Sequence, residues 1–124
     1  MSTIYLTFDD GPDPDFTPRI LDALGEADMR ATFFTIGEHA RRSPELVRRA
    51  AAEGHEIANH SFSHRHPWLM SSRAAREEVR QGAEVLRDVL GRAPRYFRPP
   101  HGRMRACMSD EAQASGQAVV LWDV

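Results

Sequence analysis

Residues 4–24 read IYLTFDDGPDPDFTPRILDAL and contain the pattern that the rest of the chain repeats. The run from Ile4 to Phe8 is β-branched and aromatic and ends at Asp9-Asp10-Gly11-Pro12, which indicates a strand followed by a turn. Thr17-Pro18 then supplies an N-cap and a proline at the first helical position, ahead of apolar residues at helical spacing. The first unit is therefore predicted to be a strand, a loop and a helix.

The same order recurs along the 124 residues. Further strands are predicted at residues 31–36, 55–58, 95–98 and 118–124, and further helices at about 43–53, 72–90 and from 109 onward. Alternating strands and helices favour an α/β fold with a mostly parallel sheet, either open and doubly wound or closed as a barrel. In both folds the chemistry lies at the C-terminal ends of the strands.

The last predicted strand, Val119 to Val124, ends the sequence with no element to cover it. Natural domains rarely leave such an apolar strand uncovered, and a closed eightfold barrel typically needs about 250 residues. We therefore expect residues 1–124 to be a domain truncated at its C-terminus, roughly the first half of a larger α/β domain.

The composition excludes several classes of partner and site. Sixteen Lys+Arg against eighteen Asp+Glu give a net charge of -2, which leaves no basic excess for a nucleic acid or an anionic membrane surface. The single cysteine, Cys107, excludes a disulfide framework and a zinc site built on several thiolates. The chain as given shows no signal peptide and no membrane-spanning run, so we expect a cytoplasmic protein.

Two adjacent carboxylates, Asp9 and Asp10, follow the first predicted strand. Neighbouring strand residues point to opposite faces, so both carboxylates can reach one pocket only where the backbone leaves extended geometry. Gly11-Pro12 favours such a departure. An ordinary solvated Asp-Asp-Gly turn is the alternative interpretation.

The segment HSFSH places His60 and His64 four positions apart. On a helical turn these positions share one face, so both imidazoles can bind one metal ion. The second residue of the segment is serine, so the built-in general base of a His-Glu-x-x-His metalloprotease is absent. A chance pair of surface histidines is the alternative. We expect His39, His55 and His66 to be ordinary surface or loop residues, although His66 is close enough to the pair in the sequence to stay a candidate.

Arg98-Pro99-Pro100-His101-Gly102 is the third polar segment at the end of a predicted strand. The two prolines fix the backbone, so the amides of His101 and Gly102 can be presented rigidly to a ligand. Arg98 can bond a carboxylate through two hydrogen bonds. A rigid surface loop with a solvated arginine is the alternative.

Together, the three segments supply the parts that a metal-assisted attack of water on a carbonyl group needs. These parts are two imidazoles and a carboxylate as ligands, a second carboxylate beside an arginine as base, and amide donors for the oxyanion. His101 is the only nearby candidate for a general acid. Two histidines and one carboxylate also form the facial triad of non-haem iron oxygenases, but an oxygenase has no evident need for the carboxylate paired with arginine.

The motifs TFDDGP (residues 7–12), HSFSH (60–64) and RPPHG (98–102) resemble the first three signature motifs of the polysaccharide deacetylases. These enzymes carry the NodB homology domain of carbohydrate esterase family 4, and within the family the chain looks closest to the chitooligosaccharide deacetylases. The resemblance covers the whole chain. It implies the first five strands of a distorted (β/α) barrel and a hydrolase that removes acetyl groups from N-acetylated oligo- or polysaccharides.

The resemblance also implies roles for individual residues. Asp10, His60 and His64 would bind a divalent metal ion, usually zinc or cobalt. Asp9 would be the general base, and Arg98 would hold it in place.

At two points the sequence departs from the family pattern. Family members more often carry tyrosine at the position of His101, whose backbone N–H is implied to stabilise the oxyanion. An Asp-x-x-Asp-Trp motif and a Leu-x-His motif, whose histidine is the family's general acid, are not found in these 124 residues. We therefore expect little or no deacetylase activity from this chain alone. An O-acetyl xylan esterase and an inactive metal- or sugar-binding fragment are the alternative functions.

Overall fold

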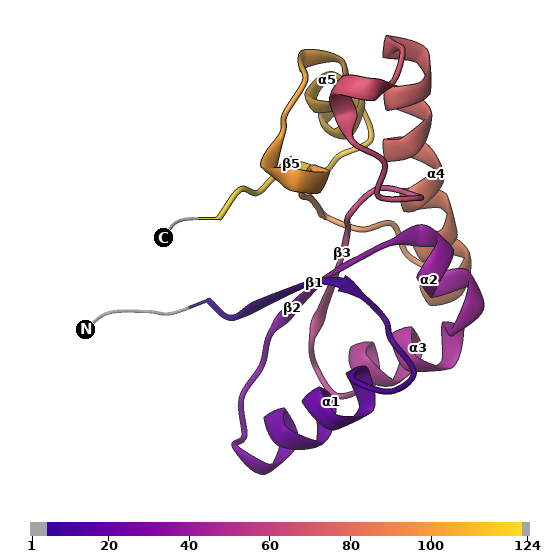
Figure 1. Ribbon diagram of the computed structural model, residues 1–124. Coiled ribbons are helices and arrows are strands. Elements are labelled where there is room, and N and C mark those ends of the chain that lie inside the picture. The colour runs from indigo at the N-terminus through magenta and orange to yellow at the C-terminus, as the bar shows by residue number, and fades with distance from the viewer. Residues whose placement is uncertain (1–4, 123–124) are drawn as a thin grey trace.

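The computed structural model describes residues 5–122 and contains a parallel five-stranded sheet (Figure 1). The strands lie side by side in the order in which they occur in the sequence, and every neighbouring pair is parallel. A doubly wound sheet reverses its order at a switch point, whereas this order is that of a barrel wall. The strands are β1 (Thr7–Gly11), β2 (Thr32–Thr35), β3 (Glu56–Asn59), β4 (Tyr96–Phe97) and β5 (Ala118–Val119).

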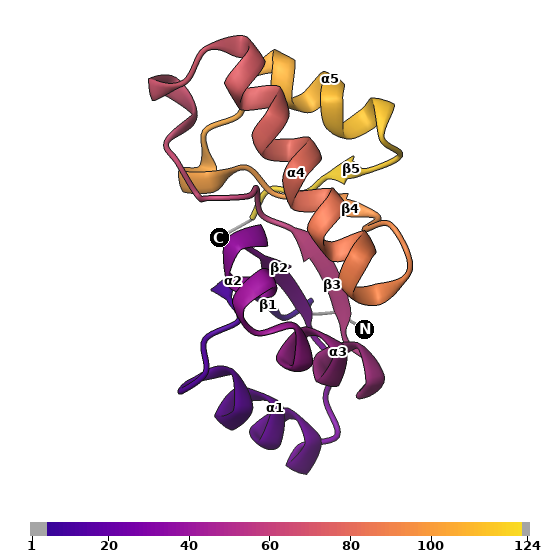
Figure 2. The same cartoon turned by 90° about the vertical axis from the view of Figure 1, so that its right-hand side faces the viewer.

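Helices connect the strands, and Figures 1 and 2 show α1 to α4 along one side of the sheet. In the described residues, no helix is long and apolar enough to cross a membrane. One-sided winding of this kind is typical of a barrel, in which helices form an outer layer. The α-helices are α1 (Thr17–Glu26), α2 (Gly37–Arg42), α3 (Pro44–Ala52), α4 (Ser72–Leu90) and α5 (Ala106–Ala114), and the short 3₁₀ turns are η1 (Pro67–Leu69) and η2 (Pro100–Gly102).

Two hydrophobic clusters attach the helices to the sheet. The larger cluster packs α1 and α3 against β2 and β3, with Leu21, Phe33 and Val47 among its buried members. The smaller cluster lies between α4, α5 and β4 and includes Phe97 and Met108. The helix α4 contributes to both clusters, through its C-terminal half in the first and its N-terminal half in the second. The helix α4 therefore links the part of the sheet around β2 and β3 to the part around β4.

Most elements lie where the sequence predicts them, but two of the strands differ. The first strand is β1 at Thr7–Gly11 rather than residues 4–8, and Ile4 lies outside the described residues. The last strand pairs over two residues rather than over 118–124, because its partner β4 is equally short and runs into Pro99-Pro100, which have no N–H to donate. Residues 123 and 124 lie outside the described residues.

Two helices also differ from the prediction. The sequence pattern does not predict α2, because its six residues are too few to show a helical period. The helix α5 begins at Ala106 instead of Ser109 and has no side-chain cap. The first turn of α5 is determined by the burial of Cys107 and Met108 in the smaller cluster. The helix therefore starts before the polar run at Ser109.

His55 lies in the loop directly before β3, but its side chain is buried and is not that of an ordinary surface residue. It is 4% exposed, and its Nδ1 accepts a hydrogen bond of 3.1 Å from the Ala31 N–H. Its ring meets that of Phe33 edge-on, with 5.3 Å between the centroids. An accepting Nδ1 carries no proton, and burial lowers the pKa of His55 below its usual value, so the fold favours the neutral imidazole.

Mildly acidic solution is therefore expected to destabilise the fold through His55. Because the pKa of His55 is lower in the folded than in the unfolded chain, its contribution to the free energy of unfolding is complete above about pH 6.5 and decreases as the pH falls below that value. Urea unfolding at several pH values from 7.5 to 5 measures this effect. His55→Gln keeps an acceptor for Ala31 and should flatten the pH dependence, whereas an equally steep dependence in the variant would contradict the assignment.

Candidate metal centre

The three polar segments predicted to carry the chemistry meet at the C-terminal ends of their strands. Asp9 and Asp10 lie in the last part of β1, His60 directly follows β3, and Arg98 directly follows β4. Asp9 and Arg98 contact each other although they are 89 positions apart in the sequence. The parallel sheet therefore assembles the site, because it places these strand ends along one edge.

The backbone of β1 is irregular at Asp10, and this turns two adjacent carboxylates to the same side. The pairing with β2 shifts register between Asp9 and Gly11, and Asp10 has a φ of 73°, which non-glycine residues rarely adopt. As a result, Asp9 Oδ2 and Asp10 Oδ1 lie 3.9 and 3.1 Å from the same His60 Nε2. Both carboxylates therefore lie beside the same imidazole.

His39 supports this irregular backbone, a role that its position in the sequence does not indicate. Its Nδ1 lies 2.7 Å from the carbonyl oxygen of Asp10 and donates a hydrogen bond to it. His39 belongs to α2, the helix that the sequence pattern does not reveal, and is 29 positions from Asp10. It is therefore more than the ordinary surface residue expected.

Asp10, His60 and His64 bring three ligand atoms together. Asp10 Oδ1 lies 3.1 Å from Nε2 of each histidine, and one ligand atom of each residue lies within 4.8 Å of the other two. Atoms that bind one zinc ion tetrahedrally at about 2.1 Å are about 3.4 Å apart. The predicted convergence of these three residues on a site of metal size is confirmed.

The hydrogen bonding of His60 leaves its Nε2 available to a metal ion. Its Nδ1 lies 2.7 Å from the carbonyl oxygen of Arg98, which can only accept, so Nδ1 carries a hydrogen and Nε2 is the ring nitrogen that can bind a metal ion. Nε2 faces the carboxylate oxygen of Asp10, and a cation between them would bind both atoms. Two imidazoles and one carboxylate are a ligand set of zinc hydrolases. These residues therefore fit a divalent metal ion.

The environment of His64 also favours a ligand. Burial lowers the pKa of His64 below its usual value, although the charge of Asp10 acts in the opposite direction. A metal ion binds only the neutral imidazole, so the lowered pKa extends the pH range in which His64 can be a ligand.

His60 and His64 do not lie on a helical turn, which corrects the geometry expected from their spacing. Ser61 and His64 have positive φ values of 68° and 62°, and residues 60–64 contain no helix. The two imidazole rings nevertheless lie close, with centroids 4.9 Å apart. The spacing identifies the correct pair because an irregular turn of this length also brings its two ends to one side.

Arg98 is a buried guanidinium that binds the carboxylate of Asp9, as predicted. Its Nη1 donates hydrogen bonds of 2.7 Å to Asp9 Oδ1 and 3.2 Å to the hydroxyl of Thr7. Its side chain is 4% exposed, and Cζ lies 4.0 Å from the centre of the Phe34 ring. One oxygen of Asp9 is thus fixed by Arg98, while the other faces His60.

His101 and His66 extend the row of imidazoles beyond the three ligands. The ring centroid of His101 lies 4.6 Å from that of His64, and His66 stacks on His101 at 5.0 Å. His101 also has a left-handed backbone, with a φ of 58°. Of the five non-glycine residues with positive φ in the described part of the chain, four lie here, namely Asp10, Ser61, His64 and His101. Residues with strained backbone therefore concentrate at this site, as they often do at functional sites.

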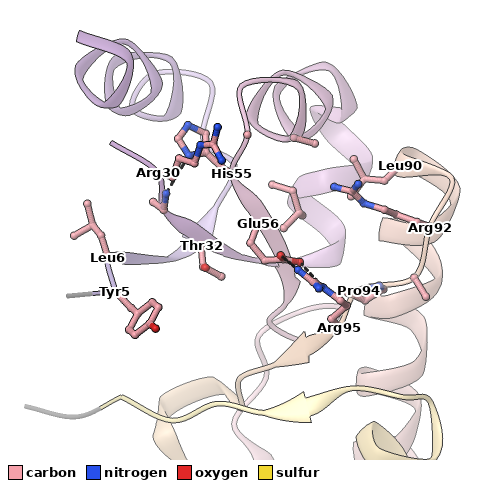
Figure 3. Close-up of a pocket in the computed structure, with 15 residues that line it drawn as sticks. Tyr5, Leu6, Arg30, Thr32, His55, Glu56, Leu90, Arg92, Pro94 and Arg95 are labelled. Atoms are coloured by element: carbon pink, nitrogen blue, oxygen red, sulfur yellow. Dashed lines mark hydrogen bonds and ion pairs between the residues drawn. The ribbon is translucent and has the colours of Figure 1, made fainter. Parts of the chain in front are cut away.

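The cavity shown in Figure 3 lies at the opposite end of the sheet and contains none of these residues. It has a volume of about 830 Å³ and is lined by the N-terminal ends of β2 and β3 and by the segment before β4. Glu56 and Arg95 form an ion pair of 2.5 Å in its wall. The candidate site is therefore marked by converging side chains and not by the size of a cavity.

Comparison with known proteins agrees with the geometry. Residues 1–120 match the family model of the polysaccharide deacetylases. The chain is 40% identical over 121 residues to a peptidoglycan-N-acetylglucosamine deacetylase of Bacillus cereus and 42% identical over 126 residues to a chitooligosaccharide deacetylase of Sinorhizobium fredii. Each match covers 98% of this chain, but 44% and 57% of the respective relative. The chain thus spans about half the length of these curated relatives.

The fold is similar to that of a solved structure, a family 4 carbohydrate esterase from Streptomyces lividans in complex with acetate. The two superpose with a TM-score of 0.92 at 35% identity, over 98% of this chain and 62% of the esterase chain. The expected α/β fold, with five parallel strands that match part of such an enzyme, is confirmed.

Breaking the Arg98–Asp9 pair is expected to destabilise the protein. Arg98→Met should lower the free energy of unfolding by about 3 kcal/mol, the low end for a buried pair, because Asp9 keeps some solvent contact. Arg95→Met is the matched control, since Arg95 is at the other end of β4 and forms an exposed pair with Glu56, for which only a small change is expected. Urea denaturation measures both, and equal losses would contradict the structural role of Arg98.

Proposed function

The chain belongs to the polysaccharide deacetylase family, and we propose from this that its three converging segments form the hydrolytic site of a metal-dependent carbohydrate N-deacetylase. The substrate would be an N-acetylated oligo- or polysaccharide. The observation that carries the proposal is the position of Asp9, which is bonded to Arg98 and lies beside the cluster of Asp10, His60 and His64. An oxygenase would have no evident use for this second carboxylate.

Asp10, His60 and His64 are proposed to hold the metal ion, with zinc or cobalt as the candidates. Such an ion, when bound, polarises the acetyl carbonyl group and makes a nearby water more acidic. The protein contributes the ligand geometry, because the Arg98 carbonyl fixes the ring of His60 and the His39 ring fixes the backbone of Asp10.

Asp9 is proposed to be the general base that removes a proton from the attacking water. Its Oδ1 is held by Arg98 at 2.7 Å, whereas its Oδ2 is directed toward the ligands and lies 3.9 Å from His60 Nε2. A base must be held within reach of the proton that it removes. The ion pair with Arg98 restricts the rotation of the Asp9 carboxylate and keeps Oδ2 on the side of the substrate.

His101 is proposed to act after the water has attacked. Its backbone N–H, on a segment stiffened by Pro99 and Pro100, would stabilise the oxyanion. The carbon–nitrogen bond breaks when the nitrogen gains a proton, which yields acetate and a free amino sugar. Among the described residues the His101 ring, beside that of His64, is the nearest candidate for this proton donor.

An O-acetylated sugar is the second candidate substrate, and the similarity to the Streptomyces lividans carbohydrate esterase favours it. An alkoxide is a better leaving group than an amide anion, so cleavage of an ester depends less on a general acid. A site with a weak proton donor would therefore hydrolyse acetylated xylan faster than an N-acetylated oligosaccharide.

Release of acetate with and without metal tests the proposed function. The chain is stripped with EDTA, reloaded with Zn²⁺ or Co²⁺, and incubated with N-acetylglucosamine oligomers, peptidoglycan or acetylated xylan. We expect one metal ion per chain and slow, metal-dependent release, since loss of a general acid typically costs about 10²- to 10⁴-fold in rate. Metal binding without any release would favour the inactive binding fragment, and absence of metal binding would contradict the proposal.

Substitution of the two carboxylates should separate their roles. Asp9→Asn is expected to remove most of the turnover and to leave metal affinity nearly unchanged, because it removes the base and spares the ligands. Asp10→Asn, which removes a ligand, is expected to weaken metal binding itself. Calorimetric titration with Zn²⁺, together with measurement of acetate, gives both quantities. An equal loss of metal affinity in the two variants would contradict the assignment.

A further inference from the structure

Glu78 is a buried carboxylate that none of the roles above uses. It lies on α4 and is 7% exposed. Its Oε2 accepts hydrogen bonds from the backbone N–H groups of Phe62 and Ser63 at 3.0 and 2.8 Å, and its Oε1 accepts one of 2.5 Å from the Ser63 hydroxyl. In the part of the chain that the structure describes, no cation pairs with it. A buried charge is costly unless it is well satisfied, so these three hydrogen bonds define its environment.

The partner of Glu78 is the turn that separates the metal ligands His60 and His64. Each backbone N–H of residues 61–64 donates to a side-chain oxygen: that of residue 61 to Asn59 Oδ1, those of 62 and 63 to Glu78, and that of 64 to the Ser61 hydroxyl. A turn held in this way has no helical hydrogen bonds to maintain its shape. Glu78 Oε2 accepts two of these four hydrogen bonds, and Glu78 is the one acceptor that lies outside residues 59–64.

The helix α4 is close enough to the turn to hold this carboxylate rigidly. A Cβ atom at Gly82 would lie 2.3 Å from Asn59 Oδ1 and 2.9 Å from the carbonyl carbon of Ser61. Gly82 is one helical turn after Glu78, so both lie on the same face of α4. Asn59 Nδ2 also donates to the Val79 carbonyl at 2.9 Å. The position of Glu78 relative to the turn is therefore fixed by direct contact of α4 with the turn.

We propose that Glu78 is a positioning residue that fixes the turn between His60 and His64 and thereby sets the geometry of the metal site. The left-handed backbone at Ser61 and His64 is unfavourable without external support. The N–H groups of Gly37 and Glu38 hold the carbonyl oxygens of Ser61 and Phe62, and Glu78 holds the N–H groups of the turn. It thus holds His64 Nε2 at 3.1 Å from Asp10 Oδ1. This inference rests on the proposed metal site. Groups that orient ligands affect metal affinity although they never touch the ion.

Glu78→Gln tests the proposal, because the amide keeps the shape of the side chain but replaces one acceptor oxygen with a donor. We expect affinity for Zn²⁺ or Co²⁺ to fall about 10- to 100-fold, and the visible absorption of bound Co²⁺, which reports ligand geometry, to change. Glu77→Gln is the matched control. It makes the same chemical change one residue earlier, on a more exposed side chain that pairs with Arg80, and should bind both ions as the unchanged chain does.

Circular dichroism of the metal-free variants shows whether they are folded at the temperature of the titration. If Glu78→Gln does not fold, Ser63→Ala tests the proposal instead, because it removes one hydrogen bond to Glu78 and adds no buried donor. Its metal affinity is expected to fall about two- to tenfold. Unchanged affinity and an unchanged Co²⁺ spectrum in the folded variant would overturn the role of Glu78 alone. Failure of the unchanged chain to bind either ion would overturn the proposed metal site and this inference with it.

Discussion

The buried guanidinium of Arg98 is the interaction on which both the sheet and the site depend. It bonds to Asp9 and Thr7 in β1, lies over Phe34 in β2, and donates from Nε to the carbonyl of Val120 after β5. A buried cation is tolerated only when it is paired and hydrogen-bonded, so this position requires a carboxylate at the end of β1. The requirement of the fold and that of the chemistry are therefore met by the same residue, Asp9.

Around this pair, the backbone is held in conformations that it would not adopt by itself. Each left-handed non-glycine residue costs on the order of 1–3 kcal/mol, and such a cost persists only where surrounding contacts determine the conformation. At Asp10 the contact is the hydrogen bond from His39. In the turn after His60 the contacts come from Asn59, from Glu78 and from the backbone N–H groups at the start of α2. The three residues of the candidate metal centre are thus oriented by residues outside it.

The sequence alone predicts what depends on neighbouring residues and on the repeating pattern. The helix α4 begins after Ser71, whose hydroxyl caps the Ala74 N–H, and ends at Gly91, which has a φ of 76°. The order of strands and helices predicts a parallel sheet, and a parallel sheet brings the ligand-bearing strand ends together. The contacts of His39, His55 and Glu78 could not be predicted, since each joins residues 15 or more positions apart and has no periodic signature.

The separation of 89 positions between Asp9 and Arg98 has a consequence for the nascent protein. During translation, Asp10, His60 and His64 are synthesised before β4. Until β4 is added to the sheet, Asp9 has no guanidinium partner and His60 lacks the Arg98 carbonyl that fixes its ring. The candidate metal centre therefore takes its final geometry only at the end of assembly, when β4 has joined the sheet.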